Sequence, residues 1–403
     1  MIRHQEYYAK PIKPVSYTNK SIKVPEDIFC PYCNAPHTFI YFNNGSKKSQ
    51  FKCKICSNTF TKEVIPEKTK YFCPHCGYAL FLWKQHPDIN LFKCGNYECS
   101  FYIKNYKKLN NKELELYKKN PGHFTLHYIY RECNIKKETL KHSEPDKPVI
   151  KISNTHNSLY VIGLVLTFFV SFAISARKTA LLLKWVFNID ISYQTVLNYA
   201  YSASYYCHQF NLKYKGDVDD IMAGDETYIK VKGKNDYIWF FISNKKRNIT
   251  AYHYSNNRGI IPAIISLDEA KRTAKPQQKI TFISDGNPSY SAALQYLNSL
   301  DQNKSEHHKV IGLQNLDSES EEYRAFKQLI ERLNRTFKSH IKQANGFNSS
   351  NGAIALTTLF VTFYNFLRPH MSLNYKVPIH LDFIQDVSNI QNKWIKILSM
   401  AYG

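Results

Sequence analysis

The chain has 403 residues, of which 54 are Lys or Arg and 32 are Asp or Glu, giving a formal net charge of +22 at pH 7. A hydrophobic content of 43% excludes a wholly disordered chain, and only 14 Gly and 16 Pro exclude a collagen-like one. The length predicts several domains. The excess of positive charge predicts a polyanionic partner, for which nucleic acid is the main candidate and an anionic membrane surface the alternative.

Cysteine placement gives the strongest local signal. Eight of the ten cysteines form three Cys-x-x-Cys pairs and a fourth, wider pair: Cys30, Cys33, Cys53, Cys56, Cys73, Cys76, Cys94 and Cys99. Two thiolates on one tight turn can reach the same ion, and two such turns complete a tetrahedral four-thiolate zinc site. We therefore predict two structural Zn²⁺ sites in tandem zinc ribbons, small β domains over residues 29–103. A disulfide scaffold or a redox Cys-x-x-Cys is the alternative, which the paired repeat in a basic chain disfavours.

The start of the chain shows no secretory signal, because its first twenty residues lack an apolar core. We therefore expect a cytoplasmic location, where a reducing environment keeps thiols free. Residues 1–28 are expected to form a basic N-terminal segment, and the Lys-, Asn- and Tyr-rich stretch 104–150 a basic linker.

The stretch 158–175 has eighteen residues and no charge. Its length fits a membrane-spanning helix, but it contains polar residues and no second span follows, so we expect a buried helix and no membrane partner. A turn near 188–191 and Ser192, a good N-cap, then introduce a helix over 193–206. This outline predicts a helix-turn-helix DNA-binding module over 151–208; a helical hairpin that touches no DNA is the alternative. The side chains expected to face outward are Gln194, Thr195, Asn198 and Tyr199.

From residue 216 the pattern changes to short strands. Strands are expected at 221–232, 237–243, 248–254, 279–284 and 309–313, and helices at 260–270, 289–300, 321–344 and 354–366. Three strands, a helix, a strand, a helix, a strand and a helix is the order of an α/β ribonuclease H-like domain with a mixed five-stranded sheet. We assign this catalytic domain to residues 209–385 and a C-terminal tail to residues 386–403.

Three carboxylates occupy informative positions in this domain. Asp225 lies in the middle of a strand, Asp285 at the end of another, and Glu331 inside a helix. An ionised carboxylate is costly to desolvate unless it is paired or bound to a metal. If the three converge, they can hold two divalent ions, and oxygen ligands favour Mg²⁺ or Mn²⁺. Glu226 is excluded from this set, because neighbouring residues of a regular strand point to opposite faces.

Three motifs carry a family resemblance. They are GDETYIKVKGKNDYIWFFIS around Asp225, FISDGNPSY around Asp285, and ERLNRTFK with the trailing FYNFLRPHMSLNYKVP. Over residues 216–380 the chain resembles bacterial and archaeal insertion-sequence transposases with an Asp-Asp-Glu triad, relatives of retroviral integrase. The resemblance implies cleavage and joining of DNA, with element ends and target DNA as substrates, Asp225, Asp285 and Glu331 as metal ligands, and a dimer or larger assembly. Many relatives lack the tandem ribbons.

The third carboxylate has a rival. Forty-five residues separate Asp285 from Glu331, more than the family commonly leaves, and Glu321 sits at the usual gap with two further glutamates beside it. We prefer Glu331 because Lys338 follows it by seven residues, close to two helical turns, which places both on one helix face. This spacing meets the family's Glu-x6-Lys motif.

The helix of Glu331 also carries residues that we expect to contact DNA: Arg332, Asn334, Arg335 and Lys338, the last on a phosphate near the scissile bond. A solvated basic face is the alternative interpretation. Two other functions fit parts of the chain. One is a sequence-specific DNA-binding regulator with an inactive domain, which the intact triad disfavours. The other is a ribonuclease H-type nuclease, which the integrase-like helix motif disfavours.

Overall fold

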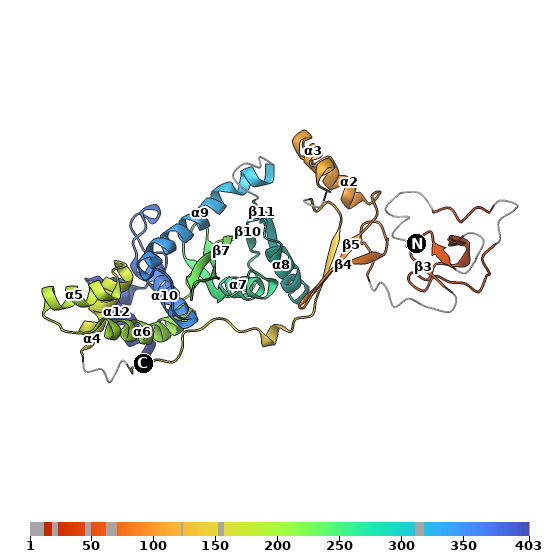
Figure 1. The fold of residues 1–403 in the computed structure, drawn as a ribbon. Coiled ribbons are helices and arrows are strands. Elements are labelled where there is room, and N and C mark those ends of the chain that lie inside the picture. The colour runs from red at the N-terminus through yellow and green to blue at the C-terminus, as the bar shows by residue number, and fades with distance from the viewer. Residues whose placement is uncertain are drawn as a thin grey trace. The chain divides into compact units, whose positions relative to one another are not determined.

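The computed structural model describes residues 12–17, 23–44, 50–61, 71–121, 124–151, 157–310 and 318–402. The chain folds into two compact units, Met1–Ile135 and Lys136–Gly403 (Figure 1). All eight metal-spaced cysteines belong to the first unit, and all three predicted carboxylates to the second. Within the described ranges, no helix has both the length and the apolar character required to span a bilayer.

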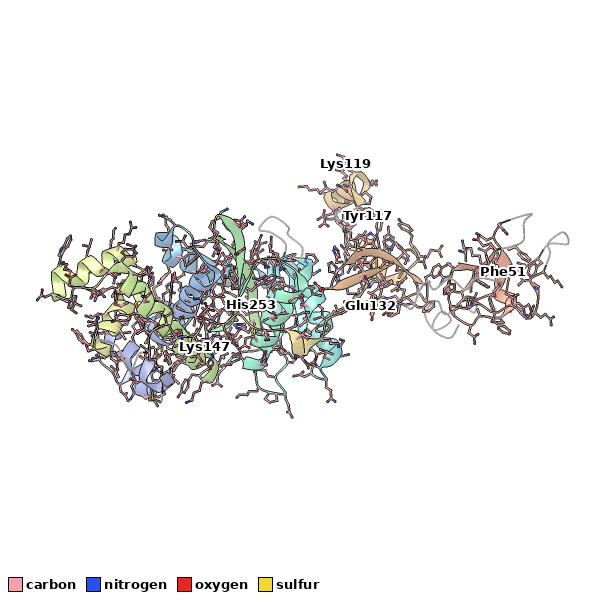
Figure 2. The ribbon with its side chains drawn as sticks, turned by 60° about the horizontal axis from the view of Figure 1, so that its bottom comes forward. Phe51, Tyr117, Lys119, Glu132, Lys147 and His253 are labelled. Carbon is pink, nitrogen blue, oxygen red and sulfur yellow. The ribbon has the colours of Figure 1, made fainter. Side chains whose placement is uncertain are left out.

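The first unit contains two three-stranded antiparallel sheets. The first has the order β1-β2-β3, from β1 (Ile40–Phe42), β2 (Phe51–Cys53) and β3 (Thr59–Phe60), preceded by the 3-10 helix η1 (His37–Phe39). Rings on successive strands pack together: the Phe42 and Phe51 centroids are 5.0 Å apart and those of Phe51 and Phe60 5.4 Å apart. Figure 2 labels Phe51 in this sheet.

The second sheet has the order β4-β5-β6, from β4 (Leu80–His86), β5 (Ile89–Cys94) and β6 (Ile129–Cys133). Two helices, α2 (Ser100–Lys107) and α3 (Asn111–Lys119), lie between β5 and β6 in the chain. The stretch expected to be a linker therefore supplies a third strand: Glu132, labelled in Figure 2, lies on β6, and its carboxylate accepts hydrogen bonds from Tyr71 (2.6 Å) and Asn90 (3.0 Å).

The second unit is built on a five-stranded sheet with the order β11-β10-β7-β8-β9. The strands are β7 (Ile221–Val231), β8 (Lys234–Ser243), β9 (Ile249–Ser255), β10 (Thr281–Ser284) and β11 (Glu306–Lys309). β7, β8 and β9 pair antiparallel, whereas β10 is parallel to both β7 and β11. The predicted mixed five-stranded sheet of an integrase-like ribonuclease H fold is thus confirmed.

Helices cover both faces of this sheet (Figure 1). They are α7 (Ile260–Thr273), α8 (Pro288–Leu300), α9 (Ser318–Ile341) and α10 (Ser350–Thr362). The rings of β8 show which helix lies on which face: Trp239 packs on Tyr290 of α8 at 5.3 Å, whereas its neighbour Phe240 packs on Phe337 of α9 at 5.1 Å and on Phe360 of α10 at 6.4 Å. Odd and even strand positions therefore face different helices.

The strand position before Asp225 must be glycine. Gly224 pairs with Phe241 across β7 and β8, and the Phe241 ring lies over the glycine. A Cβ atom at position 224 would stand 2.2 Å from Cε1 of Phe241, a separation that no side chain tolerates. The absent side chain lets the buried ring fill the sheet surface next to the first predicted catalytic carboxylate.

A helical module packs beside the sheet. It contains α4 (Leu159–Leu166), the π-helix η6 (Thr167–Ser171), α5 (Ala176–Phe187), α6 (Tyr193–Lys213) and α12 (Ile390–Tyr402). Beyond α10 the chain continues through the π-helix η8 (Phe363–Leu367), the 3-10 helix η9 (Met371–Leu373) and α11 (Asp382–Gln385). The apolar stretch 158–175 is thus mostly α4 and η6, which are largely buried in this module.

Two details of the module depart from expectation. Residues 386–403 were expected to be a tail, but residues 390–402 form α12, whose Trp394 is fully buried and donates a hydrogen bond to Ser171 at 2.9 Å. Tyr199 was expected to face outward, and this is wrong, because only 5% of it is exposed. It shares a helix face with Val196 and Ala203, both fully buried, at spacings of three and four residues.

Residues 136–151 include the 3-10 helix η4 (Lys137–Thr139), and Ser143 in this stretch hydrogen-bonds to the edge strand β9. The Ser143 hydroxyl accepts a hydrogen bond from the Tyr254 backbone at 2.9 Å, and the Ser143 backbone donates to Nδ1 of His253, labelled in Figure 2, at 3.1 Å. The buried ring of His142 lies 5.8 Å from that of His208 and 5.3 Å from that of His253. We call these three residues the histidine cluster. Burial lowers the pKa of each, to about 4 for His208 and about 3 for His253.

Candidate active site

Asp225 stands in the middle of the central strand β7. It pairs with Phe240 and therefore faces α9. From that helix, Nδ2 of Asn334 donates a hydrogen bond to Oδ2 of Asp225 at 2.9 Å. Asn334 is itself 8% exposed, so the contact is shielded from solvent and fixes the carboxylate against the helix.

Asp285 follows the last residue of β10. Because β10 is parallel to β7, with Ile283 opposite Ala223, the chain leaves the sheet at the level of Asp225. Oδ1 of Asp285 accepts the backbone N–H of Asn287 at 2.9 Å, and the Asn287 side chain in turn caps α8 by accepting the N–H of Ser289 at 3.0 Å. The end of β10, the turn that follows it and the cap of α8 together orient the Asp285 carboxylate towards β7.

The carboxylates of Asp225 and Asp285 come together, and the third acidic group beside them is Glu226. One carboxylate oxygen from each of the three lies within 4.8 Å of the others. We call these three residues the acidic cluster. Glu226 was excluded as a metal ligand because strand alternation points it to the opposite face. It does face α8, yet its carboxylate lies beside those of Asp225 and Asp285. β10, the neighbour of β7 in the sheet, ends at Ser284, so among the described residues no strand lies on that side of β7 at the level of Asp225 and Glu226. The longer Glu226 side chain can therefore reach the Asp285 carboxylate from the α8 side of the sheet.

Glu226 already has protein donors on both oxygens. Arg258 donates to Oε1 through Nε at 2.7 Å and also through Nη2, and Asn287 donates to the same oxygen at 3.0 Å. Tyr290 donates to Oε2 at 2.7 Å. Only 1% of the Glu226 side chain is exposed. Glu226 therefore holds Arg258 and the first residues of α8 in place through these hydrogen bonds. Nη2 of Arg258 also lies 3.9 Å from Oδ2 of Asp285.

Burial and the neighbouring negative charges shift the pKa of Asp225. Burial, followed by the charges of Glu226 and Asp285, raises the pKa of Asp225 to about 7, and Lys327 partly opposes the shift. Burial and the nearby Glu226 likewise raise the pKa of Tyr290 well above its ordinary value. A divalent cation placed between Asp225 and Asp285 would offset this repulsion, and carboxylate oxygens are suitable ligands for Mg²⁺ or Mn²⁺. The donor set therefore fits a hard divalent ion.

Glu331 lies on α9 but is not part of the acidic cluster. It is half-buried and sits one helical turn before Asn334, the residue that contacts Asp225, so both belong to the helix face that packs on β7. Lys338 continues the same face, and its Nζ lies 3.9 Å from the ring centre of Tyr228 on β7. The rival Glu321 also lies within α9, but its side chain falls outside the described part of the structure, as does that of Glu319; Glu322 is exposed.

Of the residues expected to contact DNA, all but Asn334 are at least partly exposed to solvent. Arg332, Arg335 and Gln194 are exposed, and Thr195, Asn198 and Lys338 are half-buried. Asn334 is instead buried and bonded to Asp225, so it belongs to the carboxylate site. Gln194 donates to Asn198 at 3.0 Å, and the Ser192 hydroxyl accepts the N–H of Thr195 at 3.1 Å, which caps α6 as predicted.

The eight predicted cysteine ligands form two clusters of four, in each of which the sulfur atoms lie within 4.8 Å of one another. Taken in pairs, the Sγ separations are 3.5 Å for Cys30 and Cys56, 3.6 Å for Cys33 and Cys53, 3.8 Å for Cys73 and Cys99, and 3.6 Å for Cys76 and Cys94. All ten cysteines are free thiols. A tetrahedron of sulfurs around zinc, with Zn–S distances of about 2.3 Å, has edges of about 3.8 Å. Both clusters therefore fit a four-coordinate zinc ion.

The fold and the convergent aspartates define an integrase-like ribonuclease H domain. Residues 221–354 match the family described as DDE domain (DDE_Tnp_IS240). This match confirms the resemblance to Asp-Asp-Glu transposases: the second unit carries a transposase-type DDE domain. No curated protein matches the chain.

The solved structures to which the chain shows some similarity include retroviral and transposon proteins. The HTLV-2 integrase catalytic core domain in complex with magnesium is 15% identical, covering 41% of this chain and 99% of its own, with a TM-score of 0.29. A simian T-cell lymphotropic virus intasome in complex with PP2A regulatory subunit B56 gamma is 13% identical over 51% of this chain and 70% of its own, at a TM-score of 0.28. The Mos1 strand transfer complex is 13% identical; the match covers 60% of this chain and 89% of its own, with a TM-score of 0.19. With TM-scores this low, these structural similarities provide no support beyond the family match.

Sequence reasoning missed several residues around the carboxylates. Tyr290 and Asn287 lie within the same motif as Asp285, and Glu226 lies beside Asp225, so the motifs already contained them without showing their roles. Arg258 stands in the turn before α7, outside every motif, and no signal in the sequence pointed to it.

Proposed function

We propose that this chain is a DNA transposase that cleaves DNA strands at the ends of an insertion sequence and joins them to target DNA, with Mg²⁺ or Mn²⁺ as cofactor. The observation that carries the proposal is that carboxylate oxygens of Asp225, on the central strand β7, and Asp285, just after the neighbouring strand β10, lie within 4.8 Å of each other in a domain that matches the DDE family. Glu331 is the proposed third ligand. Its support is its place on the α9 face that contacts Asp225 through Asn334.

The protein's part in this chemistry is positioning and charge. When bound, the divalent ions would neutralise the phosphate charge and lower the pKa of a nucleophilic water or 3′-hydroxyl. Asp225, Asp285 and Glu331 would hold them. Asn334 keeps Asp225 in place, and Asn287 does the same for Asp285 through its backbone N–H. No covalent link between protein and DNA is required, because phosphoryl transfer depends on in-line geometry and electrostatic stabilisation.

DNA would be held by basic and polar side chains on two elements. On α9 these are Arg332, Arg335 and Lys338. On α6 they are Gln194, Thr195 and Asn198, near the capped start of the second helix of a helix-turn-helix. The net charge of +22 would add salt-dependent affinity for phosphates. Holding two DNA ends together calls for a dimer or larger assembly, and a cytoplasmic location fits DNA substrates in a bacterium or archaeon.

The two cysteine clusters are proposed structural Zn²⁺ sites of tandem ribbons. Four thiolates leave no open coordination position, so these ions would stabilise the first unit and take no part in the reaction. The Sγ separations of 3.5–3.8 Å support this assignment.

A strand-transfer assay with labelled element ends tests the function. A transposase joins the ends to target DNA, a ribonuclease H-type nuclease only cuts, and a regulator only binds. We expect joining by the wild type, and loss of joining with retained end binding for Asp225→Asn and Asp285→Asn. Glu331→Gln should fail as they do, whereas Glu321→Gln should join. If Asp225→Asn or Asp285→Asn still joins strands, the metal ligands are wrongly assigned.

A further inference from the structure

The edge strand of the second ribbon exposes an unusual run of apolar side chains. In β4, Phe81 is 48% exposed, Leu82 51% and Trp83 37%, while only Leu80 is buried. β4 lies at the edge of the β4-β5-β6 sheet (Figure 1). Consecutive exposed large apolar residues on a small domain usually mark a binding surface.

A β-bulge sets the direction of the tryptophan. The pairing of β4 with β5 shifts register between Leu82 and Lys84, which leaves Trp83 without a cross-strand partner. Bulges of this kind re-aim a side chain. Phe81 pairs with Lys93, so these two share one face of the sheet, and the Phe81 ring lies over Gly95, where an added Cβ would stand 3.3 Å from Cε1 of the ring.

Two lysines accompany the tryptophan ring. Nζ of Lys84 lies 4.4 Å and Nζ of Lys93 5.0 Å from the Trp83 ring centre. The surface therefore combines two exposed aromatic rings with two ammonium groups. We call Phe81, Trp83, Lys84 and Lys93 the aromatic platform. Residues 71–135 as a whole carry nine Lys or Arg against five Asp or Glu, so the surroundings are also basic.

We propose that the aromatic platform binds single-stranded DNA, by stacking unpaired bases on Trp83 and Phe81 and by contacting phosphates with Lys84 and Lys93. Aromatic rings alternating with cations are the common means of holding single strands, because every base offers a π-face and every nucleotide a phosphate. Double-stranded DNA suits this surface less well, since its bases are already stacked on each other. A protein partner also suits it less well, because the cores of protein interfaces are depleted in lysine.

This inference is independent of the carboxylate site, because every residue it uses lies in the first unit. Its biological sense is the handling of a strand that becomes unpaired when DNA is cut. Failure of the platform would leave the proposed transposase chemistry intact, and failure of the chemistry would leave the platform intact.

The chain offers a direct optical test. Of its four tryptophans, Trp239 and Trp394 are fully buried and Trp185 is 76% exposed. In a Trp185→Phe background, Trp83 is therefore the one tryptophan that a ligand can reach. Titration of the full, zinc-loaded chain with short oligo(dT) should quench tryptophan fluorescence, and the quenching should disappear in Trp83→Phe combined with Trp185→Phe.

Affinity measurements complete the test. Trp83→Ala should weaken oligo(dT) binding by roughly 5- to 100-fold, the range for loss of one base–aromatic stack, whereas Trp83→Phe should stay near wild type. Lys84→Ala with Lys93→Ala should lower the slope of log K against log salt concentration by about 0.7 for each phosphate that is no longer bound. A matched control is Lys112→Ala with Lys118→Ala, two exposed lysines of α3 in the same unit, which should bind nearly as the wild type does.

Three results would overturn the proposal. The first is unchanged quenching without Trp83. The second is a Trp83→Ala affinity equal to that of the wild type, with two zinc ions per chain showing that the variant is folded. The third is a Trp83→Ala variant that loses self-association in sedimentation but keeps its oligo(dT) affinity, which would identify a protein interface. If Trp83→Ala fails to hold its zinc, the fluorescence comparison with Trp83→Phe decides alone.

Discussion

Replacing Asp225 with Asn is expected to stabilise the metal-free protein, because it removes one charge from the acidic cluster and keeps the side-chain shape. In the folded chain, burial and then the charges of Glu226 and Asp285 raise the pKa of Asp225 from 3.8 to about 7. The proton-linked stability is fully present below pH 3.8 and is lost as the pH rises through about 7. At pH 8 the ionised Asp225 is therefore a cost that only the folded chain bears.

The difference between a pKa of 3.8 and one of about 7 corresponds to roughly 4 kcal/mol. We expect on the order of 2–4 kcal/mol of stabilisation for Asp225→Asn at pH 8, since an amide oxygen at this position can still accept the hydrogen bond from Asn334. For a domain of this size, each 1 kcal/mol raises Tm by roughly 2–4 °C. Near pH 4 the variant and the wild type should unfold at nearly the same temperature.

The assay is thermal unfolding of the full chain in buffer freed of divalent ions other than bound zinc, followed by the fluorescence of the buried Trp239 and Trp394 in the second unit. Added Mg²⁺ should then raise the Tm of the wild type and leave that of Asp225→Asn almost unchanged. Asp219→Asn is a matched control that should destabilise, because Asp219 accepts hydrogen bonds from Ser243 and from the backbone of Lys245. A variant Asp225→Asn less stable than the wild type at pH 8 would refute the electrostatic reasoning.

Three further changes should affect stability or metal content. Gly224→Ala should destabilise the second unit by about 3 kcal/mol or more, because the new methyl group collides with the buried Phe241 ring; a urea midpoint equal to that of the wild type would contradict the close approach. The Tm of the second unit should fall as the pH drops from 6.5 towards 4, because there the unfolded chain binds protons at the histidines of the buried cluster, which outweighs the single proton that the folded chain binds at Asp225. His208→Gln should make Tm depend less steeply on pH in this range. A dependence as steep as that of the wild type would contradict the role given to the histidine cluster. Cys73→Ser should reduce the zinc content from two ions to one, whereas Cys133→Ser should leave two, as measured by elemental mass spectrometry.

Much of the second unit could be predicted from the sequence, because its strands are apolar runs with clear turns between them. The expected strands at 221–232, 237–243 and 248–254 differ from β7, β8 and β9 by at most three residues at either end. β11 is Glu306–Lys309, whereas the expected strand was 309–313, of which residues 311–313 lie outside the described part of the structure. Its sequence EHHK has no apolar pattern, because it lies at the edge of the sheet and its register comes from pairing with β10.

Elements that depend on distant partners were not predictable in the same way. β6 lies in a Lys- and Tyr-rich stretch, and it becomes a strand by pairing with β5 across an intervening pair of helices. The C-terminal helix α12 owes its place to Trp394, Ile397 and Leu398, which fill the core of the helical module. Neither partner is visible from local periodicity, which reports only on neighbouring residues.

The candidate site shows the same limit. Residue type and strand position were enough to single out Asp225 and Asp285, because Asp225 is a charge in the middle of a buried strand and Asp285 directly follows the end of another. Strand alternation placed Glu226 on the opposite face correctly, but it could not show that β10 ends early enough for the Glu226 carboxylate to reach the others. The arginine that neutralises Glu226 comes from a turn with no motif.

Binding of Mn²⁺ to the zinc-loaded chain, followed by electron paramagnetic resonance of the free ion, tests the central claim most directly. The account predicts that the wild type binds Mn²⁺, that Asp225→Asn and Asp285→Asn each lose this binding, and that Asp219→Asn keeps it. Mn²⁺ affinity that is unchanged in both of the first two variants would contradict the claim that these two aspartates share a metal ion.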